Sequence, residues 1–163
     1  SNECSRPSFN LRSVSPLCFK IKNTQGSIMN KEKAQEHIEN NLNNNDSLVG
    51  FFQAIEPPKI WLFFVIGPLA ILSMKTYFVA ATANGMHFFK LNLLGKFSDD
   101  DFFNFNEIEN VKIGKGLLQR PFLFQFKNSR KLKIKAQLKG VDKIAKLTDE
   151  TQNHIENNIP RIK

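Results

Sequence analysis

The stretch from Lys75 to Asn158 most constrains the fold, because short apolar runs alternate there with turn-forming residues. Asn84-Gly85 separates two such runs, and this dipeptide predicts a β-hairpin because both residues tolerate the positive φ of a primed turn. Further strand-like runs follow, and the apolar residues of the last segment recur at helical spacing. The predicted elements are strands at 77–82, 86–91, 102–105, 108–113, 118–126 and 132–137 and a helix at 141–157.

The order of these elements predicts a small barrel or sandwich capped by a helix. Residues 30–43 predict a further, shorter helix, since Asn30 is a good N-cap and the apolar residues repeat every four positions. Residues 48–55 are typical of a buried first strand, which Pro57-Pro58 ends because proline cannot donate to a β-ladder. We expect the C-terminal helix to cap the sheet with an apolar face made of Val141, Ile144, Ala145, Thr148, Thr151 and Ile155.

The chain of 163 residues is long enough for one domain with a hydrophobic core. Composition changes abruptly at Met29, and residues 1–28 show no regular apolar period, so we expect a leader added by cloning or a native disordered tail. Only two cysteines occur and no secretory pattern is visible, which predicts a cytoplasmic protein. The remaining divisions are a helix and linker at 29–46, the main domain at 47–158 with an insertion at 57–74, and a tail at 159–163.

Fifteen consecutive residues, Ile60 to Met74, carry no charge and are bracketed by Lys59 and Lys75. A helix that crosses a membrane needs about 20 apolar residues, and Gly67-Pro68 would kink or split one here. Three interpretations stay open: a segment buried in the fold or in a homo-oligomer contact, an interfacial or re-entrant membrane segment, and a true membrane span. A strand–turn–strand hairpin also fits the pattern. The candidate contact residues are Trp61, Leu62, Phe63, Phe64, Ile66, Leu69, Ile71 and Leu72.

The formal net charge is +8, and eleven basic residues lie between Val111 and Lys146 with only Asp142 opposing them. Such a face attracts anionic lipid or nucleic acid, or simply keeps the protein in solution. Lys131, Lys133 and Lys135 alternate with apolar residues, and we favour an edge strand protected by lysines over an anion-binding stripe. We do not expect a nucleic-acid partner, since the alternating phenylalanines suit the core. The candidate anion- or lipid-binding residues are Lys112, Lys115, Arg120, Lys127, Arg130, Lys131, Lys133 and Lys135.

Side chains suited to catalysis or metal binding do not converge in the sequence. His37, His87 and His154 lie on three different predicted elements, without Cys, Asp or Glu at ligand spacing. Residues 99–101 are three aspartates on one strand, whose alternating directions favour a solvated strand entry over a cation site. We therefore expect no enzyme, no metal, no cofactor and no small-molecule substrate.

From Leu48 to Asn158, the order and lengths of the segments resemble a bacterial pleckstrin-homology-like (PH-like) domain. The resemblance is carried by the apolar first strand, the run Tyr77–Thr82, Gly95-Lys96, the Phe105–Ile113 segment, the paired strands around Lys127–Arg130 and the C-terminal helix. It implies a mainly β fold: a bent antiparallel sheet or partly open barrel of about seven strands, capped by the helix.

The chain departs from the family's pattern in two places. Ala83–Met86 replaces a usual basic-Leu pair after the second strand, and the first connection carries the long apolar insertion. In eukaryotic PH domains that connection holds the basic cluster that binds phosphoinositides, whereas only Lys59 and Lys75 occur here. We therefore do not expect phosphoinositide recognition.

The resemblance implies a non-enzymatic binding or scaffold module, but a fold does not specify its ligand. In one interpretation the chain docks peripherally on the inner face of the membrane, where the basic residues and the apolar segment contact anionic lipid. In the other it is a soluble protein-interaction domain that forms a homo-oligomer through the apolar segment and has no lipid role.

Overall fold

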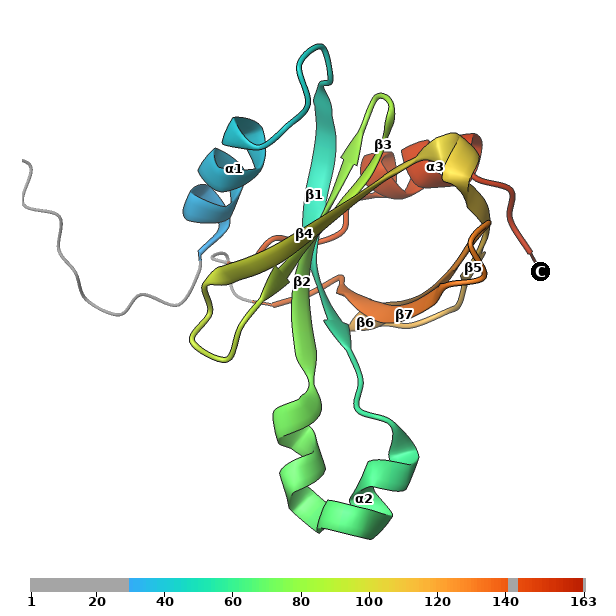
Figure 1. Cartoon of the computed structure of the whole chain (residues 1–163). Coiled ribbons are helices and arrows are strands. Elements are labelled where there is room, and N and C mark those ends of the chain that lie inside the picture. The colour runs from blue at the N-terminus through green and yellow to red at the C-terminus, as the bar shows by residue number, and fades with distance from the viewer. Residues whose placement is uncertain (1–29, 141–143, 163) are drawn as a thin grey trace, which may run out of the picture.

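The computed structural model describes residues 30–140 and 144–162 of the chain (Figure 1). In this part a single antiparallel sheet of seven strands is ordered β4-β3-β2-β1-β7-β6-β5, which confirms the predicted mainly β fold. The expected leader at 1–28 lies outside the described residues. The elements are α1 (Lys31–Asn40), β1 (Leu48–Glu56), α2 (Ile60–Ile66), η1 (Gly67–Ser73), β2 (Lys75–Thr82), β3 (Gly85–Leu91), β4 (Phe97–Asn104), η2 (Phe105–Glu107), β5 (Ile108–Ile113), β6 (Gln119–Phe126), β7 (Lys131–Gln137) and α3 (Asp149–Asn158).

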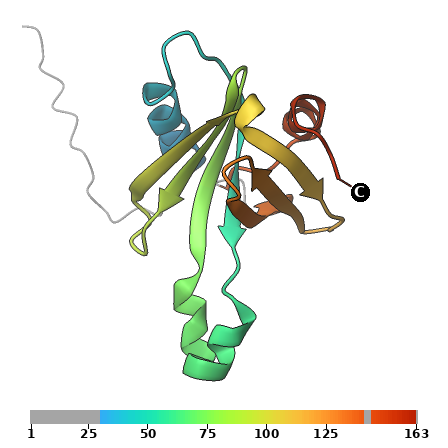
Figure 2. The same ribbon diagram turned by 45° about the vertical axis from the view of Figure 1, so that its right-hand side comes forward.

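The sheet bends sharply at β1. This strand pairs with β2 along its whole length, from Leu48 opposite Thr82 to Glu56 opposite Lys75. On its other side it pairs with β7 only at Ala54–Ala136 and Ile55–Lys135. Because so few ladder bonds hold them in plane, β5, β6 and β7 curl away from β1–β4 and form a half-barrel (Figure 2).

Phenylalanine fills the concave side of the half-barrel. Phe52, Phe88 and Phe124 are buried there, and the Phe88 and Phe124 ring centroids lie 5.5 Å apart in an edge-to-face contact. Ile155 of α3 packs on the same core, so the C-terminal helix covers the open side, as the sequence predicts. Residues expected to form a tail take part in the fold as well. Val111 donates to the Pro160 carbonyl and accepts from the Ile162 amide, which covers the free edge of β5.

A second, smaller core lies on the opposite face of β2 and β3. Helix α1 packs Ala34 and Ile38 there against Phe78 and Phe89, so the predicted spacing of four residues marks its buried face. The Asn30 side chain accepts from the Lys33 amide at 3.0 Å, which confirms the N-cap. The structured helix ends at Asn40, three residues before the predicted boundary of 43.

The C-terminal helix begins later than predicted. Its N-cap is Thr148, whose hydroxyl accepts from the Thr151 amide at 3.2 Å, and acidic Asp149 and Glu150 occupy the first turn. Residues 144–147 are not helical and bond to the sheet instead: the Ala145 carbonyl accepts from the Gln53 amide, and the Leu147 amide donates to the Gln137 carbonyl. The helix predicted at 141–157 is therefore wrong before 148 in its described part, and residues 141–143 lie outside that part. The helical spacing of apolar residues gave a wrong prediction here, because a non-helical segment packed on the sheet also buries apolar residues.

Two strand predictions are also corrected. Strand β4 begins at Phe97 rather than at 102, and its polar first half was missed because an edge strand faces solvent and shows little apolar alternation. The hairpin at Asn84-Gly85 forms as predicted, but neither residue has positive φ. Gly85 is required for a different reason: a Cβ there would lie 2.2 Å from the Phe103 carbonyl oxygen.

Truncating the buried face of α3 should destabilise the domain. Ile155 is fully buried, so Ile155→Ala should lower the free energy of unfolding by about 2–4 kcal/mol through lost burial and a cavity. Ile162→Ala is the matched control, since Ile162 is nearly half exposed, and it should cost less than about 1 kcal/mol. Urea denaturation measures both. Equal losses would contradict the capping role of α3.

Candidate functional site

A short helical hairpin projects from the end of β1 and β2. It consists of α2 and η1, which the chain joins at Gly67 with a positive φ of 57° (Figure 1). Pro68 follows at the start of η1, where its missing N–H is not needed. The strand–turn–strand prediction for this segment is therefore wrong.

The hairpin is mostly exposed, although it is apolar. Phe64 is 86% exposed and Ile60 77%, and only Ala70 is buried between its two arms. The interpretation of a segment buried within its own fold is therefore wrong. No helix in the described part of the chain is long and apolar enough to cross a membrane. Of the predicted contact residues, Leu62 is half-buried. The exposed ones are Trp61, Phe63, Phe64, Ile66, Leu69, Ile71 and Leu72. Ile60 and Val65, which were not predicted as contact residues, are exposed as well.

Polar contacts hold the base of the hairpin. Glu56 ends β1 directly opposite Lys75, the first residue of β2. The Lys75 ammonium lies 3.3 Å from the Glu56 carboxylate, and the buried Tyr77 hydroxyl donates to the same carboxylate at 3.1 Å. Burial and the nearby charge of Glu56 raise the pKa of Tyr77, which keeps its hydroxyl protonated as a donor. The hairpin therefore leaves the sheet from a fixed point.

The lysines of β7 lie on the convex face of the half-barrel. Lys131, Lys133 and Lys135 are exposed, and the residues between them are buried in the core. Lys112 of β5 joins them, because Lys112 lies opposite Leu123 and Leu123 lies opposite Lys133. Strand β7 lies between β1 and β6 in the sheet, but it pairs with β1 only at Lys135 and Ala136. The favoured interpretation of an edge strand protected by lysines is therefore wrong at Lys135, whereas Lys131 and Lys133 lie on the stretch of β7 that pairs with β6 alone. The four lysines form one surface, the convex lysine face.

The other predicted basic residues lie elsewhere. Arg120 points to the concave side and bonds the Gln152 side chain of α3. Arg130 contacts Asp101 at 2.7 Å and lies over the Phe103 ring, so it fastens the β6–β7 turn to β4. Lys115 and Lys127 are exposed in the loops before and after β6. The sequence could not separate these roles, since spacing within a strand does not show what faces it across the sheet.

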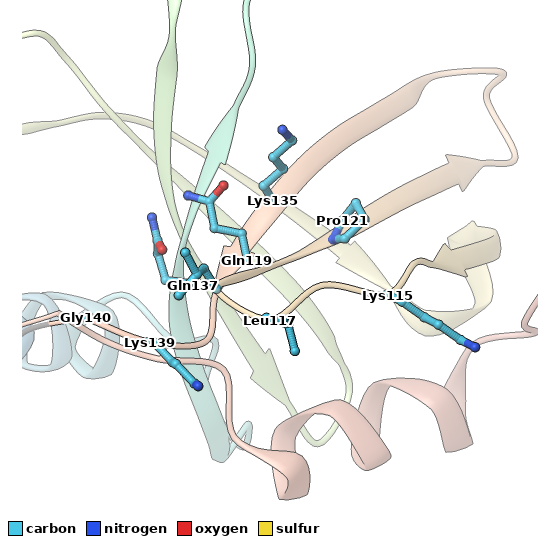
Figure 3. Close-up of a pocket in the computed structure, with 9 residues that line it drawn as sticks. Lys115, Leu117, Gln119, Pro121, Lys135, Gln137, Lys139 and Gly140 are labelled. Atoms are coloured by element: carbon cyan, nitrogen blue, oxygen red, sulfur yellow. The ribbon is translucent and has the colours of Figure 1, made fainter.

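The hairpin and the convex lysine face are turned to the same side of the molecule. Lys135 pairs with Ile55, one residue before the end of β1. Figure 1 shows the hairpin projecting on the side of the convex face of β6 and β7, with α3 on the opposite side. In the close-up, Lys135 points in the direction in which β1 runs on toward the hairpin (Figure 3). An apolar projection thus stands beside a basic surface.

A depression of about 790 Å³ opens between the β5–β6 loop and the end of β7. Lys115, Lys135 and Lys139 line it together with Leu117 and other residues. Figure 3 shows Lys135 pointing to one side and Lys115 and Lys139 to the other. The ammonium groups do not converge, so this depression lacks the arrangement that would hold a single phosphate.

The histidines are separate structural residues. His37 stacks on Phe97 with ring centroids 3.8 Å apart, and the His154 ring bonds the Thr82 carbonyl at 2.8 Å. The described residues contain no group of His, Cys, Asp or Glu arranged to hold a metal ion.

His87 is buried on β3 between the rings of Phe89 and Phe102. Neither ring nitrogen has a hydrogen-bond partner in the described residues, and Nδ1 lies 3.9 Å from Asp100 Oδ2. Burial lowers the pKa of His87, against a smaller raising effect of Asp100 and Asp46. The fold therefore holds this imidazole neutral.

Comparison with known proteins informs the fold. No protein-family model and no curated protein matches the sequence. Among solved structures, the chain is similar to the hSac2 domain from the human phosphoinositide phosphatase Sac2, with a TM-score of 0.50 and 12% identity over 80% of this chain and 85% of that one. At this identity the likeness shows the fold alone: a curled antiparallel half-barrel with a C-terminal helix. Such a fold, with its two exposed surfaces, fits a binding module.

His87 should make stability depend on pH. Its pKa is lowered from the usual 6.5, so as pH falls through about 6.5 the unfolded chain takes up a proton that the folded chain resists. The free energy of unfolding should therefore fall between neutral and mildly acidic pH. His87→Leu should flatten this slope in urea denaturation series at several pH values. Identical slopes for the two proteins would contradict this account of His87.

Proposed function

We propose that this chain is a non-enzymatic binding module of the bacterial PH-like type that docks peripherally on the anionic, cytoplasmic face of a membrane. The α2–η1 hairpin enters one leaflet, and the convex lysine face lies against the lipid phosphates. The observation that carries the proposal is the exposure of the hairpin's apolar side chains beside that basic face. Exposed apolar patches of this kind mark interaction sites.

The size of the hairpin matches a single leaflet. Seven helical residues span about 10 Å, whereas half of the hydrocarbon core is about 15 Å thick. Apolar residues are exposed along the whole hairpin, at its base in Ile60 and Leu72 as well as near its turn in Phe64 and Leu69. Lys59 and Lys75 flank the base, at the level where cations meet headgroups.

Charge supports the same orientation. On β6, the residues opposite the four lysines of the convex face are the uncharged Leu123, Pro121 and Gln125. Each lysine near an anionic bilayer contributes about 1 kcal/mol to binding. The structural neighbour belongs to a phosphoinositide phosphatase, so a similar fold occurs in a protein that acts on a membrane lipid. This supports lipid as the class of ligand without indicating which lipid.

Charged side chains in the hairpin should abolish docking. Phe64→Glu with Leu69→Glu places two carboxylates in the leaflet, at a cost of about 2.5–3.5 kcal/mol each. Wild-type protein should float with mixed phosphatidylcholine–phosphatidylglycerol vesicles, and the variant should stay at the bottom of the gradient. Trp61, the single tryptophan of the chain, should shift its emission to the blue on vesicle binding in the wild type only.

The matched control is Leu117→Glu with Leu118→Glu, which adds the same charge to exposed leucines outside the hairpin. It should float like the wild type. Equal loss in both variants would attribute the effect to net charge and contradict insertion. A different result would overturn lipid docking in favour of self-assembly. In that case the wild type would not bind vesicles and would elute as a dimer in size-exclusion chromatography, and the hairpin variant would elute as a monomer.

Removing the lysines of β7 should weaken binding and reduce its salt dependence. Lys131→Gln, Lys133→Gln and Lys135→Gln together should cost about 1 kcal/mol per lysine, measured as vesicle affinity at low and high salt. Lys115→Gln, Lys127→Gln and Lys139→Gln together remove the same charge from other exposed positions and should have a smaller effect. Indistinguishable triple variants would show that net charge, rather than the convex lysine face, attracts the membrane.

A further inference from the structure

The turn between β3 and β4 exposes two adjacent leucines that the proposed hairpin contact does not use. Leu93 is 82% exposed and Leu94 79%. In the sequence, two leucines are too short a run to stand out beside the longer apolar segment. These largely exposed leucines belong to neither core.

This turn is rigid. The Asn92 side chain accepts from the amides of Leu94 at 2.9 Å and Lys96 at 3.0 Å, and the Asn92 amide donates to the Lys96 carbonyl at 2.8 Å. Gly95 closes the turn with a φ of 71°, which a residue with a Cβ rarely adopts. These hydrogen bonds hold the backbone of the turn in one conformation before a ligand binds. Binding through the two leucines therefore requires little further loss of backbone entropy.

The turn lies at the end of the sheet from which the hairpin projects. Leu91, the last residue of β3, pairs with Thr76, the second residue of β2. Residues 92–96 therefore extend beyond the paired strands next to Lys75 and the hairpin base. Figures 1 and 2 both show the β3–β4 turn at this end, to one side of the hairpin.

The charges around this end suit an anionic surface. Lys59, Lys75, Lys90 and Lys96 lie near this end together with the acidic residues Glu56, Asp99 and Asp100. Glu56 pairs with Lys75 and Asp99 with Lys90, and basic residues outnumber acidic ones there by one. Further along β4, Arg130 pairs with Asp101. The exposed leucines thus stand among lysines, as at a bilayer interface, where apolar side chains enter and ammonium groups stay with the phosphates.

We propose that the β3–β4 turn is a second, shallower membrane contact, in which Leu93 and Leu94 enter the boundary between headgroups and acyl chains. This inference rests on the proposed function. Two separate points of insertion fix how the domain is rotated on the membrane, and that rotation holds the convex lysine face toward the lipid. If the hairpin were the sole point of insertion, the domain could rotate about the axis of the hairpin.

The first test measures affinity. Leu93→Ser with Leu94→Ser should weaken binding to phosphatidylcholine–phosphatidylglycerol vesicles by about tenfold or more, from the lost burial of two leucines. Leu117→Ser with Leu118→Ser is the matched control in another exposed loop, where Leu117 points away from the side to which Lys135 points (Figure 3). It should bind like the wild type. Thermal unfolding should be unchanged in both, because all four side chains are exposed.

The second test measures depth directly. In a Trp61→Phe background, Leu94→Trp places the only tryptophan in the turn, and brominated lipids in the same vesicles should quench it. Leu117→Trp in that background should not be quenched. Wild-type Trp61 reports on the hairpin in parallel.

These readouts separate two failures. Quenching of wild-type Trp61 with no quenching at position 94, or undiminished affinity of the Leu93→Ser, Leu94→Ser variant, would overturn the second contact and leave the proposed function standing. No quenching at either position, with no flotation of the wild type, would overturn both. Quenching at 94 together with the loss of affinity supports the inference.

Discussion

The short contact between β1 and β7 determines the shape of this protein. Two residue pairs join the strands, whereas β1 pairs with β2 along its whole length. Ala54 and Ala136 meet at this junction, and both are buried. The sheet can therefore fold back on itself there, and its concave side closes on phenylalanine. The same bend turns the outer face of β7 toward the hairpin, which a flat sheet would not do.

The half-barrel also explains why the hairpin stays outside it. Phe52, Phe88, Phe122, Phe124 and Phe126 already fill the concave side, and α3 covers the opening. Pro57-Pro58 end β1 before the apolar run begins, so the run leaves the sheet as a separate hairpin. Within it only Ala70 finds a buried position. The apolar surface of the hairpin is therefore surplus to the core, which is the physical basis for assigning it to a partner.

Much of the fold could be predicted from local pattern, but less of the site. Alternation identified β7 and the outward direction of its lysines, because residues two apart on a strand share a face. The same pattern could not show that the end of β7 pairs with β1, since the two strands lie far apart in sequence. Arg120 and Arg130 appeared equivalent to those lysines, yet they bond Gln152 and Asp101 of distant elements. Leu93 and Leu94 lacked any signal except exposure, which only the folded chain reveals.

The sequence by itself determined the class of the fold: the succession of strands along the chain, the helix that caps the sheet and an uncharged segment shorter than a typical membrane span. These follow from periodicity, turn residues and chain length, which act over a few residues. Tertiary structure decided that the segment is an exposed helical hairpin, that α3 begins at Asp149 after the N-cap Thr148, and that four lysines share the convex face. Each of these depends on which side chains meet across the sheet. Such contacts are set by the bend at β1 and leave no local trace in the sequence.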